Sequence, residues 1–152
     1  MRNLTPEEVY DNLVSKGFYE EANLDKDEVQ KVLSMVKEDF NFAKRMKAEK
    51  NPSWRVIFNA YYDVLRELCD QLLRFKRKKI SNHQGVFASM KLDFPDLDFD
   101  WELIERIRTL RNQNKYQGTD ISEKMWKSVD IQFELLISIV MKEVEEKLRR
   151  NF

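Results

Sequence analysis

One short stretch of the chain concentrates side chains that can bind phosphate. It reads RTLRNQNKYQGTD, residues 108–120, and it closes a segment of helical periodicity at a Gly118 turn. Side chains four residues apart lie on one face of a helix. If the helix continues through the stretch, it presents two neighbouring rows of polar side chains: Arg108, Asn112 and Tyr116 in one row, and Arg111 and Lys115 in the other.

These residue types suit the recognition of a phosphate group or a base. The guanidinium of arginine binds phosphate through two parallel hydrogen bonds. Asparagine donates to a phosphate or a base edge, and tyrosine stacks on a base or donates its hydroxyl. The alternative is structural: the same arginines and asparagines would brace the helix end at the Gly118 turn. Side-chain chemistry alone leaves both interpretations open.

Two further features are candidates for binding. His83, the one histidine, follows Ser81 and Asn82 in KISNHQG. It is either a helix-start residue bonded to a nearby carbonyl or carboxylate, or part of the lining of a ligand cleft. RFKRKK, residues 74–79, has five cations in six positions. It is either a solvated helix end or a contact for a phosphate backbone.

The sequence argues against the common catalytic centres. One histidine cannot form a multi-histidine metal site within one chain. The single cysteine, Cys69, shares a helical face with Leu65 and Leu72, so we expect it in the core rather than as a nucleophile. The chain has no GK[ST] phosphate loop and no Glu-x-x-His pair for a di-iron site. We therefore expect neither a metal nor a cofactor.

Composition narrows the function classes further. Basic and acidic residues balance at 27 each, so any contact with nucleic acid must come from a local patch. No run approaches twenty apolar residues, and the N-terminal MRNLTPEEVY lacks the apolar segment of a signal peptide. These observations predict a cytoplasmic protein without a membrane span. A single cysteine also precludes a disulfide within the chain.

The elements that position these residues are predicted to be helices. The 152 residues contain only three glycines and three prolines, which favours one all-α domain over residues 1–152. We expect five to six helices in an up-and-down bundle, since no segment alternates with period two for long enough to require a sheet. Capping residues mark the expected helix starts: Thr5-Pro6, Asp25, Asn51-Pro52, Ser81-Asn82, Asp98 or Asp100, and Asp120-Ile121-Ser122.

The last predicted helix, which ends near Arg149, is apolar on nearly all sides. Ile131, Leu135 and Ile139 lie roughly opposite a broader apolar stripe. A helix of this kind is buried on more than one side, either as a central helix or at a subunit interface. We therefore expect a homodimer. The broader stripe consists of Val129, Phe133, Leu136, Ile137, Val140 and Val144.

Three landmarks, in this order, resemble the HEPN domain, the small helical bundle of prokaryotic toxin–antitoxin systems. They are the helix AYYDVLRELCDQLLRFK, the segment KISNHQGVFASM and the Arg-Asn motif RTLRNQNKYQG, and a long closing helix follows them. The resemblance covers roughly residues 26–148. It implies a bundle of about five helices that dimerises, with the motif in a cleft between two protomers.

The resemblance also implies a choice of functions. Many HEPN domains are metal-independent ribonucleases whose signature is an arginine, a polar residue and, a few positions later, a histidine. Others bind RNA or nucleotides, and many are paired with a minimal nucleotidyltransferase. By position the family's arginine is Arg111, its polar residue is Asn112, and its histidine position falls on Tyr116. A free tyrosine has a pKa of about 10, whereas a histidine titrates near neutrality.

Three hypotheses follow. The leading one is a dimeric module that binds RNA, a nucleotide or a nucleotidyltransferase partner, with His83 and Arg108 at the edge of a site formed by Arg111, Asn112, Lys115 and Tyr116. The second is a ribonuclease in which Arg111 stabilises the phosphorane and Tyr116 acts as the acid. The third is a bundle that only holds a protein partner, with the motif bracing the fold. Whether His83 approaches Arg111 is left open by the sequence.

Overall fold

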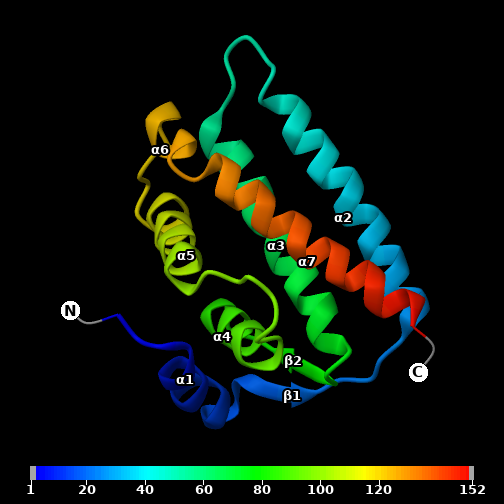
Figure 1. Cartoon of the computed structure of the whole chain (residues 1–152). Coiled ribbons are helices and arrows are strands. Elements are labelled where there is room, and N and C mark those ends of the chain that lie inside the picture. Colours follow the sequence, from blue (N-terminus) through cyan, green and yellow to red (C-terminus); the bar gives the residue numbers. More distant parts are fainter. Residues whose placement is uncertain (1–2, 151–152) are drawn as a thin grey trace.

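The computed structural model describes residues 3–150 and is mostly helical (Figure 1). The high helical content confirms the predicted all-α class. Along the described chain the elements are α1 (Pro6–Val9), η1 (Tyr10–Phe18), β1 (Tyr19–Glu21), α2 (Lys26–Met46), α3 (Trp54–Arg74), β2 (Lys78–Ile80), α4 (His83–Asp93), α5 (Trp101–Tyr116), α6 (Glu123–Lys127) and α7 (Asp130–Arg149).

Side-chain caps begin most of the helices where the sequence predicts them. The backbone N–H of Glu8 donates to the Thr5 hydroxyl at 3.2 Å, and the Glu8 carboxylate accepts from the Thr5 backbone in return. Asp25, Asn82 and Asp100 accept from backbone N–H groups in the first turns of α2, α4 and α5. Each cap satisfies a donor that has no partner within its helix.

Three of the helices differ in detail from the prediction. The third helix begins after Ser53, which caps it, rather than at Asn51-Pro52. The first helix passes from α1 into the π-helical η1 and then stops, as predicted, at Gly17, where φ is 95°. The predicted last helix is two helices, because the chain turns at Ser128 between α6 and α7. The described chain therefore has eight helical segments instead of five or six.

A two-stranded sheet corrects the expectation that no strand is present. The strand β1 pairs antiparallel with β2, and Tyr19 lies opposite Ile80. RFKRKK is therefore not one helix end: α3 stops at Arg74, Arg77 has a φ of 59°, and Lys78 begins β2. The left-handed conformation of Arg77 turns the backbone away from α3. The following strand β2 can then pair with β1, which lies far away in the sequence.

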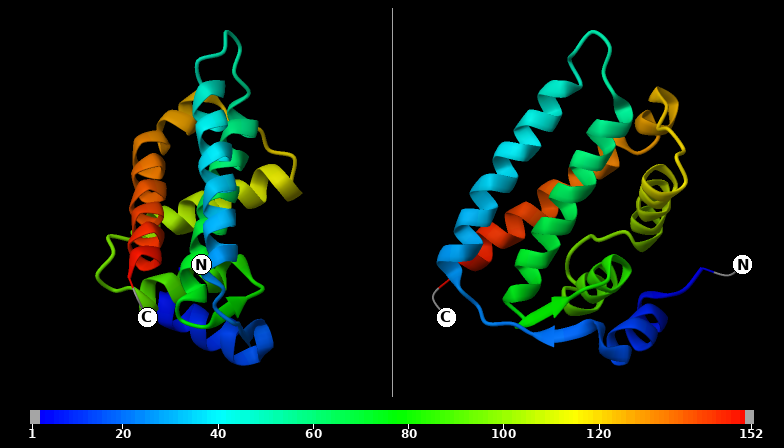
Figure 2. Two further views of the ribbon diagram at one scale, coloured as in Figure 1. Left: turned by 90° about the vertical axis from the view of Figure 1, so that its right-hand side faces the viewer. Right: turned by 180° about the vertical axis from the view of Figure 1, so that it is seen from behind.

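The central helix of the bundle is α3. It packs against α2, α4, α5, α6, α7 and β2, and Figure 2, right, shows it between α2 and the pair α4 and α5, with α7 behind it. Tyr61 occupies the middle of its core face. The Tyr61 ring meets three other rings edge-on, with centroid distances of 5.2 Å to Phe40, 4.9 Å to Trp126 and 5.5 Å to Phe133. Such edge-to-face pairs stabilise a core beyond the area they bury.

The helix α7 is buried on one side only, so it is not the central helix. Its broad stripe, which includes Phe133 and Val140, is buried as predicted. Its second stripe faces outward, since Ile131 is 82% exposed and Leu135 is 58% exposed. The structure therefore does not bear out the explanation that the second stripe is buried in the centre of the bundle.

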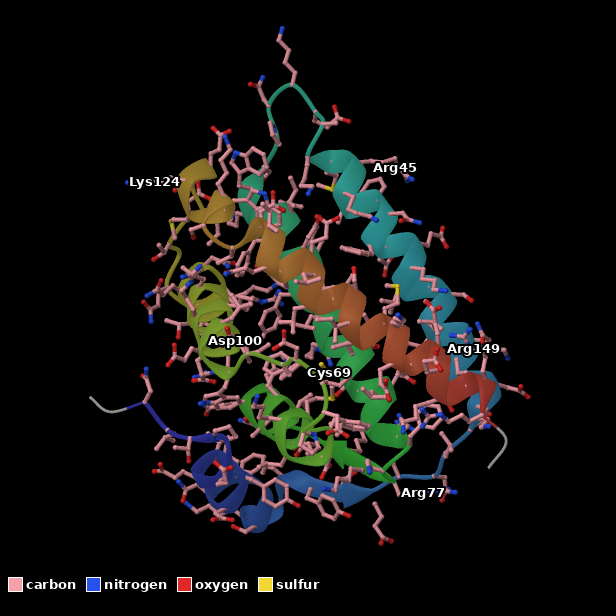
Figure 3. All side chains as sticks on the ribbon, in the orientation of Figure 1. Arg45, Cys69, Arg77, Asp100, Lys124 and Arg149 are labelled. Carbon is pink, nitrogen blue, oxygen red and sulfur yellow. The ribbon has the colours of Figure 1, made fainter. Side chains whose placement is uncertain are left out.

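Cys69 is buried in the core, as predicted, and Figure 3 shows it in the middle of the bundle. Burial raises the pKa of its thiol well above the ordinary value, because the thiolate would be poorly solvated there. Within residues 3–150, no helix has both the length and the apolar character needed to cross a membrane.

The two stripes of α7 predict a contrast in stability. Phe133→Ala should lower the free energy of unfolding by about 3–5 kcal/mol, because it empties space beside the Tyr61 and Phe58 rings. Ile131→Ala, two residues away and largely exposed, should change it by less than about 0.5 kcal/mol. Urea denaturation followed by circular dichroism measures both. Equal losses in the two variants would contradict the packing described.

Candidate functional site

The polar stretch forms the last turns of α5, which continues to Tyr116. Beyond it Gly118 has a φ of 69°, and the backbone N–H groups of Gln117 and Thr119 both donate to the carbonyl of Gln113. This is a left-handed helix termination of the kind that glycine favours. The predicted rows of side chains therefore exist, and they face different neighbours.

One row opens into a cavity between α4 and α5. His83, the first residue of α4, and three α5 side chains line this cavity, whose volume is about 340 Å³. The three are Arg108, Asn112 and Tyr116, so the structure brings together four of the six residues singled out in the sequence. Tyr116 is 80% exposed at the cavity mouth. We call this cavity the α4–α5 cavity; its remaining lining residues are Leu13, Ser81, Asn82 and Gln84.

The other row turns away from the cavity. The Arg111 side chain is only 11% exposed and reaches α3, where its Nη1 donates to the Asn59 carbonyl at 3.2 Å. Its Nη2 lies 3.1 Å from an Asp63 carboxylate oxygen. Arg111 thus braces α5 against α3, as the structural interpretation of the motif predicts. Lys115 is exposed and is not among the residues that line the α4–α5 cavity.

Tyr62 links Arg111 to His83. The Arg111 guanidinium lies over the Tyr62 ring, 4.8 Å from its centroid. The Tyr62 hydroxyl lies 3.2 Å from Nδ1 of His83, within hydrogen-bonding distance. His83 therefore approaches Arg111 through one intervening side chain. The bond occupies Nδ1, which leaves Nε2 as the ring nitrogen that can meet a ligand.

Sequence reasoning missed Tyr62, because it lies off the apolar face of α3 that Tyr61 and Val64 belong to and nothing in the sequence marks it as buried. In the structure it is fully buried. A buried tyrosine normally needs a partner for its hydroxyl, and here that partner is His83. Burial raises the Tyr62 pKa, so the hydroxyl keeps its proton and can donate it to the imidazole.

A second carboxylate fixes Arg108 at the cavity wall. Glu105 accepts from Nε and Nη2 of Arg108 at 3.2 and 3.0 Å, and from the Gln84 side-chain amide at 3.0 Å. The guanidinium is held in one orientation, with Nη1 outside these two bonds. Preorganisation of this kind lowers the entropy cost of binding an anion.

The cations around His83 lower its pKa below the ordinary value. Partial desolvation of the ring is the largest cause, and the charges of Arg66, Arg111 and Arg108 add to it, while Asp63 opposes them. Arg66 itself is held by Asp70 at 2.6 Å. The imidazole is therefore neutral at pH 7, and a bound anion would find guanidinium groups near the ring.

His83 also lines a second cavity, of about 250 Å³, between α3, β2 and α4. Arg74 and Lys79, from the RFKRKK run, line this cavity, as does Lys78, whose Nζ lies 2.8 Å from an Asp93 oxygen. Part of the basic run is thus next to the histidine.

The side chains that could bind a metal ion are dispersed over the part of the chain that the structure describes. Among residues 3–150, no group of three or more histidine, cysteine, aspartate or glutamate side chains is placed to hold a metal ion.

Compared with protein-family models, with curated proteins and with solved structures, the chain finds no match.

The charges at the site predict the titration of His83, whose imidazole signals are unambiguous in a proton NMR spectrum because the chain has one histidine. The pKa of His83 should lie below 6.5, and Arg111→Ala should raise it by removing one of the cations that disfavour the imidazolium. Lys115→Ala, which removes an exposed cation from the same helix, should leave it unchanged. A wild-type pKa at or above 6.5 would contradict the assigned surroundings.

Proposed function

We propose that the protein is a HEPN-like dimeric module that binds a phosphate group of RNA or of a nucleotide in the α4–α5 cavity, and that it works with a minimal nucleotidyltransferase partner. The observation that carries the binding site is the convergence of Arg108, Asn112, Tyr116 and His83 on one cavity. They come from two helices and offer hydrogen-bond donors to the same space. The resemblance of the three sequence landmarks supports the family and the partner.

Each side chain has a distinct part in this proposal. Arg108, held by Glu105, presents its remaining guanidinium N–H groups to the phosphate. The neutral His83 donates from Nε2, since Tyr62 occupies Nδ1. Asn112 donates its amide, and the exposed ring of Tyr116 stacks on a base. Arg111 binds no ligand here; it positions Tyr62, and through it His83.

A second function has a specific observation in its favour. The histidine that the ribonuclease signature requires is missing from the motif, but His83 reaches the same site from α4. This version uses the other tautomer of the neutral imidazole: Nδ1 carries the proton and donates to the Tyr62 oxygen, and the unprotonated Nε2 takes the proton of the RNA 2′-hydroxyl, whose oxygen attacks phosphorus. The bond from phosphorus to the 5′-oxygen breaks, and the Tyr116 hydroxyl gives that oxygen a proton. His83 thus takes one of the two proton-transfer roles, and Tyr116 keeps the role of the acid.

Binding can be tested with fluorescein-labelled mixed-sequence RNA in EDTA. Tyr116→Ala should weaken binding by about ten-fold or more, because base stacking on an aromatic ring contributes about 1–3 kcal/mol. Because the Tyr116 side chain is largely exposed, its removal should not unfold the protein, so weaker binding can be assigned to the lost ring. Met35→Ala, a change at an exposed apolar residue on α2, should bind like the wild type. Fluorescence anisotropy gives both affinities, which should fall as salt rises.

Gel electrophoresis of the same mixtures separates the two functions. Intact RNA bound by the wild type supports the binding module. Cleavage by the wild type that His83→Ala abolishes makes the protein a ribonuclease. Wild-type protein that neither binds nor cleaves RNA or a nucleotide would contradict both proposals, and would leave the Arg-Asn motif with the bracing role of Arg111.

The dimer is proposed from the exposed apolar stripe of α7. Leu135→Glu should shift the protein from dimer to monomer in sedimentation velocity, because it places a charge in the middle of that stripe. Met35→Glu, which alters a similarly exposed apolar residue on α2, should leave the dimer intact. A wild-type monomer would exclude a cleft shared between protomers. An unchanged dimer in Leu135→Glu would place the interface elsewhere.

A further inference from the structure

A separate groove runs between α2 and α3. Its volume is about 650 Å³, and its apolar lining consists of Val36 and Phe42 from α2 and Ala60 and Val64 from α3. Figure 2, right, views the molecule from the side where these two helices lie next to each other in front of α7. Its lining residues run from Val36 to Arg45 on α2, a stretch of about 15 Å, and from Ala60 to Glu67 on α3. We call this feature the α2–α3 groove.

Apolar side chains extend the groove along α2. Phe42 is 58% exposed and Met35, two helical turns before it, is 63% exposed. Residues seven apart lie on nearly the same face of a helix, so the two side chains form one strip beside the groove. Single exposed apolar residues need no explanation. Met35 and Phe42 together, on one face of α2 beside an apolar groove, form a surface suited to packing against another protein.

The charges around the groove are mainly acidic. Glu38 and Asp39 on α2, together with Asp63 and Glu67 on α3, line it, against two arginines, Arg45 and Arg66. The charge of Arg66 is already taken up within the protein, since its Nη1 lies 2.6 Å from Asp70 and its Nη2 lies 3.4 Å from Glu67. The charges of Glu67 and Asp63 are likewise taken up, by Arg66 and by Arg111. Glu38 and Asp39 then face Arg45, which leaves a small excess of negative charge over the groove.

From the apolar lining, its length and the excess of carboxylates, we propose that the α2–α3 groove docks an amphipathic, basic helix of a protein partner. Leucine-like side chains at helical spacing would fill the lining, and lysines or arginines flanking them would meet the carboxylates. The inference does not depend on the phosphate site, which lies in the separate cavity between α4 and α5.

The test uses two labelled peptides of about 18 residues, about 27 Å long as helices. Both carry leucines at helical spacing; the remaining positions are lysine in one and glutamate in the other. In anisotropy titrations with the full chain, the lysine peptide should bind about ten-fold or more tightly than the glutamate peptide. Phe42→Lys and Asp39→Lys should each weaken lysine-peptide binding by about ten-fold or more.

Leu135→Lys is the matched control, because Leu135 and Phe42 are both 58% exposed. It should bind the lysine peptide like the wild type, whatever it does to the dimer. The inference is wrong if Phe42→Lys and Asp39→Lys bind as well as the wild type, or if both peptides bind equally. It is also wrong if sedimentation shows a wild-type dimer that Phe42→Lys dissociates and Leu135→Lys does not, because a second copy would then cover the groove.

Discussion

The structure depends on the packing of α3 against the helices around it and β2. Two consecutive residues of this helix, Tyr61 and Tyr62, are both fully buried, and they serve different parts of the protein. Tyr61 packs with Phe40 and the aromatic rings of α6 and α7, which stabilises the bundle. Tyr62 points to α4 and α5, where it contacts His83 and lies under Arg111. The aromatic core and the polar site are thus held by neighbouring positions of one helix.

The site itself is a set of cations with partners already in place. Arg108 is held by Glu105, with both side chains largely buried, and the buried side of Arg111 is held by Asp63, whose carboxylate is exposed. A guanidinium left unpaired in such surroundings would be costly, so the carboxylates permit the positive charges to gather near His83. The balance of 27 basic and 27 acidic residues is thereby also a local balance. A ligand anion meets positive groups that are oriented but incompletely neutralised.

Local sequence information predicted the helices and failed where distant segments meet. Asp25, Asn82 and Asp100 mark helix starts because a cap acts over a few residues. The pairing of β1 with β2 joins segments on either side of α2 and α3, and no period-two pattern announces strands of three residues. The partners of Arg111 are similarly distant, since Asn59 lies 52 residues away. The residues of the site were therefore recognisable from the sequence, and their division between cavity and brace was not.

Consecutive residues of an α-helix project about 100° apart. Tyr61 and Tyr62 therefore fix the rotation of α3 about its axis. If the helix turned, either the Tyr61 ring would leave the aromatic core or the Tyr62 hydroxyl would leave His83. With the axis and rotation of α3 set in this way, the side chains of Asn112 and Tyr116 can be exchanged without disturbing the bundle. The lining of the α4–α5 cavity and the packing of α3 are thus set by different residues.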